Sequence, residues 1–172
     1  MIYGGIKKLN TRKLTKLSLL TAIALIIFII EMRLPDLSGI PGVKLGLANI
    51  ITVYALYHFK AYEVAMVVFV RILLGSVFGG NMSAMIYSLS GAVLCLVGMI
   101  FLKKIINEKY IWLSSVAGAI LHNTGQILAA MAVTRSTAVF AYYPVLVVSG
   151  CIAGVFTGIC ASILIKRVGD KI

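Results

Sequence analysis

Charged side chains are scarce in this chain. Only 12% of its 172 residues are charged, whereas 61% are hydrophobic. A soluble domain typically has about 25% charged and about 45–50% apolar residues. A chain of this length has too little interior to bury so much apolar surface in water. The composition therefore excludes a soluble domain and predicts a protein that lies in the lipid bilayer as one compact unit.

Several signatures of catalysis are missing as well. The sequence has no G-x-x-x-x-G-K-[ST] phosphate loop and no H-E-x-x-H motif, and His58 and His122 are its two histidines. A magnesium–diphosphate enzyme needs clustered carboxylates, but the two aspartates, Asp36 and Asp170, lie far apart in the sequence. We therefore expect neither an enzyme nor a bound cofactor.

The cysteines are expected to be structural, and the basic residues do not indicate nucleic-acid binding. Cys95, Cys151 and Cys160 form no C-x-x-C pair and lie inside apolar runs, which is typical of small buried side chains. The net charge of +11 is carried by basic residues between the apolar runs, with no aromatic residues interleaved. Nucleic acid is therefore not expected as a partner.

Charges and turn residues divide the chain into six apolar segments, each near the roughly 20 residues that a helix needs to cross a bilayer. The segments are residues 14–32, 40–59, 61–79, 83–102, 111–133 and 141–165. Pro41, Gly42 and Lys44 are expected to shorten the second one. Runs such as residues 19–27 do not show the alternation of polar and apolar residues that a membrane barrel needs. The sequence predicts an all-α bundle of six transmembrane helices in a single membrane domain, residues 1–172.

The basic residues predict an orientation, because cytoplasmic loops are enriched in Lys and Arg. Twelve of the sixteen fall on one side of the six predicted spans: Lys7, Lys8, Arg12, Lys13, Lys16, Lys60, Lys103, Lys104, Lys109, Lys166, Arg167 and Lys171. Arg33, Lys44 and Arg135 fall on the other side. This split predicts that both termini lie in the cytoplasm and that the protein is a multi-pass protein of the cell membrane.

The sixteenth basic residue, Arg71, lies near the centre of the third segment. A guanidinium keeps its charge, so at membrane depth it needs a carboxylate, a water-filled cavity or an anionic ligand. We expect Arg71 to line a cavity, and hydrogen bonding to backbone carbonyls is the alternative.

The fifth segment carries a second polar group in its middle. His122 and Gln126 are four residues apart and share a helix face, and Asn123 lies beside them. Such residues in lipid predict a ligand site, although an interhelical hydrogen-bond network is the alternative. Together with Arg71 they are expected to form an outward-opening pocket for a polar or anionic small molecule, which would also include Lys44, Asn49 and Asn81.

Glycines mark where helices are expected to approach each other closely. Gly75 and Gly79 form a G-x-x-x-G pair, and Gly150, Gly154 and Gly158 repeat on one face of the last segment. Such ridges of small residues are typical of helix packing in membranes.

Three blocks of residues together resemble the Gx transporter family, which is also labelled heptaprenyl diphosphate synthase component I. The blocks are residues 41–50 (Pro-Gly-Val-Lys-Leu-Gly-Leu-Ala-Asn-Ile), Arg71-x-x-Leu74-Gly75 and residues 122–126 (His-Asn-Thr-Gly-Gln). That family is similar to the S-components of energy-coupling factor transporters. The resemblance implies a six-helix subunit in a bacterial plasma membrane that captures a vitamin-like or cofactor-precursor-like molecule.

The same resemblance implies partners. S-components rely on a separate transmembrane coupling subunit and on two cytoplasmic ATPases, which agrees with the missing phosphate loop. They often carry an Ala-x-x-x-Ala face on the first helix for docking. The nearest match here is Ser18-x-x-x-Ala22, continuing to Ile26.

Three functions therefore remain open from the sequence. The first is a substrate-binding subunit for small-molecule uptake. The second is a non-catalytic accessory subunit in polyprenyl or quinone metabolism, as the family's other label implies. The third is a scaffold for a membrane redox assembly.

Overall fold

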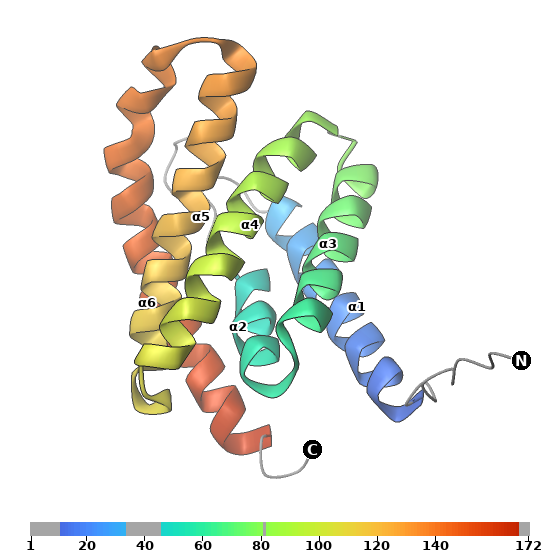
Figure 1. Ribbon diagram of the computed structural model, residues 1–172. Helices are drawn as coiled ribbons and strands as arrows, with labels where there is room; N and C mark the ends of the chain where they lie inside the picture. The colour runs from blue at the N-terminus through green and yellow to red at the C-terminus, as the bar shows by residue number, and fades with distance from the viewer. Residues whose placement is uncertain (1–10, 34–45, 81, 169–172) are drawn as a thin grey trace, which may run out of the picture.

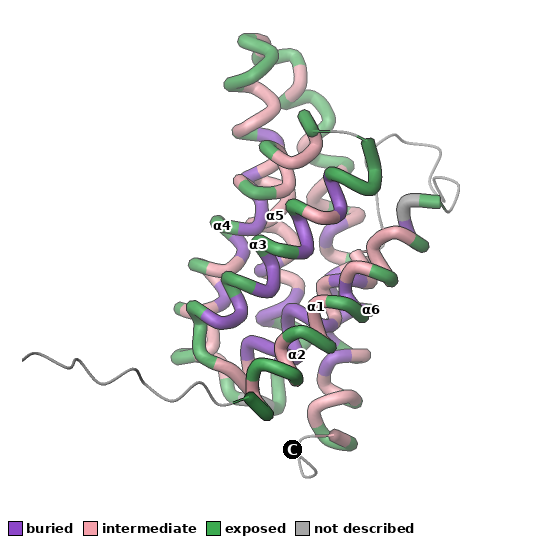
Figure 2. Tube along the Cα trace, turned by 90° about the vertical axis from the view of Figure 1, so that its right-hand side faces the viewer, coloured by how far each residue is buried: buried purple, intermediate pink, exposed green. Residues whose placement is uncertain are grey.

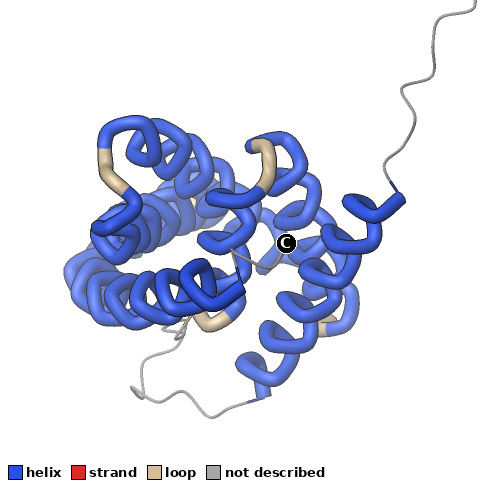
Figure 3. The backbone as a smooth tube through the Cα atoms, turned by 90° about the horizontal axis from the view of Figure 1, so that it is seen from below, coloured by secondary structure: helices blue, strands red, loops and turns tan. Residues whose placement is uncertain are grey.

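The computed structural model describes residues 11–33, 46–80 and 82–168, without the side chains of Met32 and Glu108. All the regular structure in these ranges is helical (Figures 1 and 3). The α-helices are α1 (Thr11–Arg33), α2 (Ala48–His58), α3 (Ala61–Phe78), α4 (Met82–Ile105), α5 (Ile111–Thr134) and α6 (Tyr143–Val168). Two short 3-10 helices, η1 (Glu108–Tyr110) and η2 (Thr137–Tyr142), precede α5 and α6.

Five of these helical segments are long and apolar enough to cross a bilayer. They are α1, α3, α4, α5 and the continuous segment of η2 and α6. Their bounds lie within a few residues of the predicted segments, and successive elements run in alternate directions through the bundle (Figure 1). The prediction of an all-α, multi-pass membrane protein is confirmed.

The second predicted span differs from the structure. A helix over residues 40–59 was expected, but α2 begins at Ala48 and has 11 residues. At about 1.5 Å per residue it is roughly 16 Å long, about half of the 30 Å hydrocarbon core. Gly46 takes a positive φ of 68°, and its carbonyl accepts a hydrogen bond from the Asn49 N–H in the turn that begins α2. Residues 40–45 lie outside the described part of the chain.

Helix α2 lies inside the bundle and forms the centre of its core. Seven of its 11 residues are buried, and it packs against α1, α3 and α6. Figure 2 shows the buried residues on the inner faces of the helices and the exposed ones on the outside. The core cluster consists of Val53, Ala55, Leu56, Val64, Val68, Ile72, Ala92, Cys95, Met99, Ile111 and Ala161. The half of the bundle that contains α2 is therefore filled with side chains.

Side chains from two other helices satisfy backbone groups near the ends of α2. The Gly46 N–H, just before the helix, donates a hydrogen bond to Glu31 of α1. The Lys103 Nζ of α4 donates to the Leu56 carbonyl at 2.7 Å and lies 5.2 Å from the centre of the Tyr57 ring. Helix ends leave backbone groups without partners, and such groups are costly away from water. These contacts let a half-length helix end inside the bundle.

Basic residues gather at the end of the bundle where α1 begins and α6 ends (Figure 1). In the described ranges this end carries Arg12, Lys13, Lys16, Lys60, Lys103, Lys104, Lys109, Lys166 and Arg167. Arg33 and Arg135 lie at the opposite end. We call the first the basic end; that it faces the cytoplasm stays a prediction.

Close approach of the helices depends on glycines. A Cβ on Gly154 of α6 would lie 2.6 Å from the Val116 Cα of α5, and one on Gly158 would lie 2.5 Å from the Trp112 Cα. On the other side of α5, a Cβ on Gly125 would lie 2.8 Å from the Gly91 Cα of α4. Real Cβ atoms do not fit at these distances, so glycine is required where α5 meets α4 and α6.

The glycine contact between α5 and α6 yields a prediction. We expect Gly154→Leu to push the two helices apart and to destabilise the protein by roughly 1–3 kcal/mol, as overpacking does in other cores. The measurement is the thermal melting temperature of the purified protein in detergent. Val148→Leu, an enlargement at a position of α6 that is 62% exposed, serves as the control and should melt like wild type. Equal melting of the Gly154→Leu and wild-type proteins would contradict this packing.

Candidate functional site

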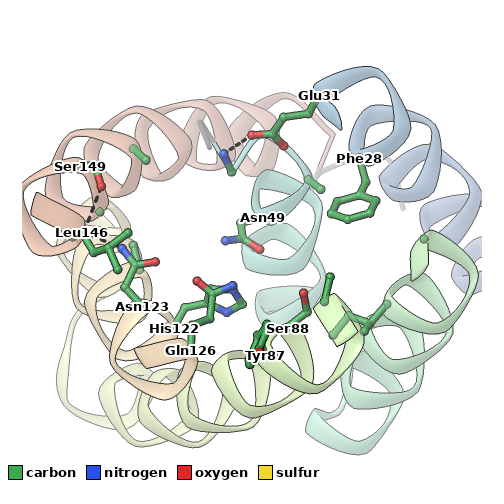
Figure 4. A pocket seen from close by; sticks show the side chains of 18 of the residues that line it. Phe28, Glu31, Asn49, Tyr87, Ser88, His122, Asn123, Gln126, Leu146 and Ser149 are labelled. Carbon is green, nitrogen blue, oxygen red and sulfur yellow. Dashed lines mark hydrogen bonds between the residues drawn. The ribbon is translucent and has the colours of Figure 1, made fainter. Parts of the chain in front are cut away.

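A cavity of about 560 Å³ lies beyond the N-terminus of α2, in the half of the bundle away from the basic end (Figure 4). All six α-helices contribute to its walls. The polar side chains among its lining residues are Glu31, Asn49, Arg71, Ser76, Tyr87, Ser88, His122, Asn123, Gln126, Tyr142 and Ser149. Because α2 fills the core only as far as Ala48, the space beyond it is left to these residues.

Arg71 of α3 lines this cavity and is only 6% exposed. Its Nη1 donates a hydrogen bond to the Thr52 Oγ1 of α2 at 3.3 Å. A guanidinium has five N–H donors, and within the described residues no other hydrogen bond and no carboxylate within 4.0 Å engages them. Such a buried charge is costly unless a partner arrives, so Arg71 is a strong candidate for holding an anionic group.

The polar residues in the middle of α5 have two different roles. Asn123 donates from Nδ2 to the Leu146 carbonyl of α6 at 2.6 Å, beside Gly150, where a Cβ would lie 2.7 Å from that nitrogen. This amide therefore joins two helices as well as lining the cavity. His122 and Gln126 point toward the cavity in Figure 4, and both lie against Gly91 of α4.

Two amides face the cavity without a partner among the described residues. In the described part of the chain, neither the Asn49 side chain of α2 nor the Gln126 side chain of α5 makes a hydrogen bond within the structure. Each amide offers both a donor and an acceptor. Together with Arg71, they can recognise a polar molecule by direct hydrogen bonds.

The structure adds residues that the sequence did not single out for the site. Glu31 of α1 is 7% exposed and lines the cavity near the turn before α2. Tyr87 and Ser88 of α4 and Ser149 of α6 supply hydroxyls, and Phe28 supplies an aromatic wall. A signal for Glu31 was available, because it is a carboxylate that directly follows a long apolar run. The hydroxyl residues gave none, since serine and tyrosine are common in membrane helices.

The predicted site residues are distributed as follows. Five of them, Asn49, Arg71, His122, Asn123 and Gln126, line this one cavity, and their role in binding stays a prediction. The other two, Lys44 and Asn81, lie outside the described residues.

The predicted docking residues lie on the surface of the bundle. Ser18 and Ala22 of α1 are both exposed, as is Ile26, so these residues form a continuous stripe on one face of the helix. Docking of a partner there stays a prediction.

The cavity is lined by groups that can form hydrogen bonds and ion pairs with a small molecule. The described residues provide one cationic and one anionic side chain, two amides that have no partner among them, and several hydroxyls around a partly apolar space. Among the described residues, no three His, Cys, Asp or Glu side chains gather as metal ligands would.

Comparison with known proteins gives one family. No curated protein and no solved structure is found that matches the chain. The family model described as heptaprenyl diphosphate synthase component I matches residues 20–164, a range that contains all the described residues lining the cavity. The chain therefore belongs to the heptaprenyl diphosphate synthase component I family.

Proposed function

We propose that this protein is a membrane-embedded substrate-binding subunit that takes up a small polar molecule, with energy supplied by other proteins. The observation that carries the proposal is the buried guanidinium of Arg71, which donates one hydrogen bond to Thr52 and faces a cavity of about 560 Å³. A polar cavity in a bilayer is costly to maintain, so it is expected where a ligand is bound.

Cavity size and position support the same function. Small-molecule sites typically have volumes of about 300–1,000 Å³ and combine apolar walls with a few placed polar groups. The cavity fits that range and lies in the half of the bundle that would face the outside if the basic end faces the cytoplasm. Substrate would then enter from outside.

Uptake also needs an energy source and therefore partners. The sequence contains no ATP-binding phosphate loop. We propose that a transmembrane coupling subunit and cytoplasmic ATPases supply the energy, and that the exposed stripe of Ser18, Ala22 and Ile26 on α1 contacts the coupling subunit.

A second candidate function follows from the family description. A component I would be a non-catalytic accessory subunit of a polyprenyl diphosphate synthase. One feature weighs against binding the product directly, because a diphosphate carries several negative charges. Among the described residues, Arg71 is the only Lys or Arg that lines the cavity, and Glu31 adds a negative charge there.

The ligand test uses protein purified gently from its membrane. We expect native mass spectrometry to detect a bound small molecule on the wild type. Arg71→Ala should lower its occupancy by at least about tenfold, since a hydrogen bond to a charged group contributes about 1.5–3 kcal/mol. His122→Ala should also lower occupancy, and Arg33→Ala, at an exposed position, should not.

Melting curves of each variant separate loss of binding from loss of folding. If Arg71→Ala melted like wild type and kept full ligand occupancy, the proposal that Arg71 binds the ligand in this cavity would be wrong.

Copurification distinguishes the two candidate functions. We expect affinity-tagged protein, isolated in mild detergent, to bring down a transmembrane subunit and ATPases. Replacing Ala22 by Trp should weaken that association through its bulk, whereas Val148→Trp on the exposed face of α6 should not. Recovery of a soluble prenyl synthase in place of ATPases would favour the accessory-subunit function.

A further inference from the structure

Glu31 is a buried carboxylate, and the described residues satisfy only part of its hydrogen-bonding capacity. It lies at the end of α1 away from the basic end, is 7% exposed, and accepts one hydrogen bond from the Gly46 N–H. A carboxylate has two oxygens with room for about four hydrogen bonds. No Lys or Arg side chain lies within 4.0 Å of it in the described residues. Figure 4 shows one oxygen directed at the Gly46 N–H and the other left beside the cavity.

Arg71 faces the same cavity from α3 without pairing with Glu31. The two charges are near enough to interact electrostatically, yet no ion pair within 4.0 Å joins them. Arg71 instead contacts Thr52, in the second turn of α2, whereas Glu31 contacts Gly46, two residues before that helix begins. Among the described residues, the cavity therefore has one cationic side chain deep along α2 and one anionic side chain near the start of α2.

Other buried charge in the bundle is paired directly. Glu63, which is 8% exposed, forms an ion pair with Lys13 at 2.7 Å and accepts hydrogen bonds from the Lys60 N–H and the Tyr62 hydroxyl. The fold can thus neutralise a buried carboxylate with side chains of its own. At the cavity it holds two opposite charges apart, which leaves each of them available to a ligand.

Charge balance then distinguishes among ligand classes. An anion bound to Arg71 would add a negative charge to a weakly polarisable space that already contains Glu31. A cation bound to Glu31 would leave Arg71 unpaired in the same way. A molecule that carries both charges pairs with each side chain and leaves the cavity neutral, which is the favoured state where charges are buried.

We propose that the ligand of this cavity is a zwitterion, with an anionic group bound by Arg71 and a cationic group bound by Glu31. This inference rests on the proposed binding function. It makes Glu31 a specificity-determining residue that rejects plain anions, while Asn49 and Gln126 hydrogen-bond the neutral part of the molecule.

The test applies an aqueous extract of bacterial metabolites below about 1 kDa to the purified protein in detergent. Unbound compounds are removed, and retained ones are identified by mass against standards. We expect the wild type to retain a zwitterionic compound. Glu31→Gln keeps an oxygen for the Gly46 N–H but removes the charge, so retention of the zwitterion should fall at least about tenfold. Glu63→Gln, which removes a buried carboxylate far from the cavity, should retain it as wild type does.

Each remaining outcome has a definite meaning. Retention by the wild type of a compound without a cationic group would overturn the zwitterion and leave the binding function intact. Undiminished retention of a zwitterion by Glu31→Gln would also overturn the proposed role of Glu31 and leave the binding function intact. If the wild type retained no compound at all, the binding function itself would fail, and the zwitterion with it. Melting curves test whether Glu31→Gln and Glu63→Gln are folded. Glu31→Asp is a second variant, in which the negative charge is kept.

Discussion

A helix that ends inside a membrane bundle needs partners for its terminal backbone groups, and the rest of this structure depends on how α2 meets that requirement. Lipid offers no hydrogen bonds, so an unpaired N–H or carbonyl there costs several kcal/mol. Glu31 accepts the Gly46 N–H before the first turn, and Lys103 donates to the Leu56 carbonyl in the last turn. These two contacts, from α1 and α4, give partners to backbone groups near both ends of the 11-residue helix α2.

The length of α2 divides the interior into two parts. On the side of the basic end, its buried face packs with Val64, Met99 and Ala161 into a dense core. Beyond Ala48, the helices of the described residues leave the polar cavity. The glycine contacts of α5 with α4 and α6 bring His122 and Asn123 close enough to line it. The packed core and the cavity therefore meet at one place, the position at which α2 begins.

Much of this arrangement could be predicted from the sequence, because long apolar runs and the placement of charge carry strong signals. The helices other than α2 lie where those signals put them, and Arg71 and His122, singled out for the cost of placing them in lipid, both line the cavity, while their role in binding stays a prediction. Pro41, Gly42 and Lys44 predicted a shortened second segment but not its start at Ala48, beside a tertiary contact between Glu31 and Gly46, 15 residues apart in the sequence. Tyr87 and Ser88 were missed for a similar reason: only the direction of α4 decides that they face the cavity.

The central claim is that the cavity beyond α2 is a polar, water-accessible site that opens away from the basic end. Site-directed thiol labelling tests it most directly, in a protein whose Cys95, Cys151 and Cys160 are replaced by alanine. Ser88→Cys places a thiol at the cavity wall, and Val93→Cys, at a position 53% exposed, places one on the outer face of the same helix. With a membrane-impermeant reagent added outside intact cells, the account predicts labelling at position 88 and none at 93. Labelling at position 88 only from the cytoplasmic side, or from neither side, would contradict it.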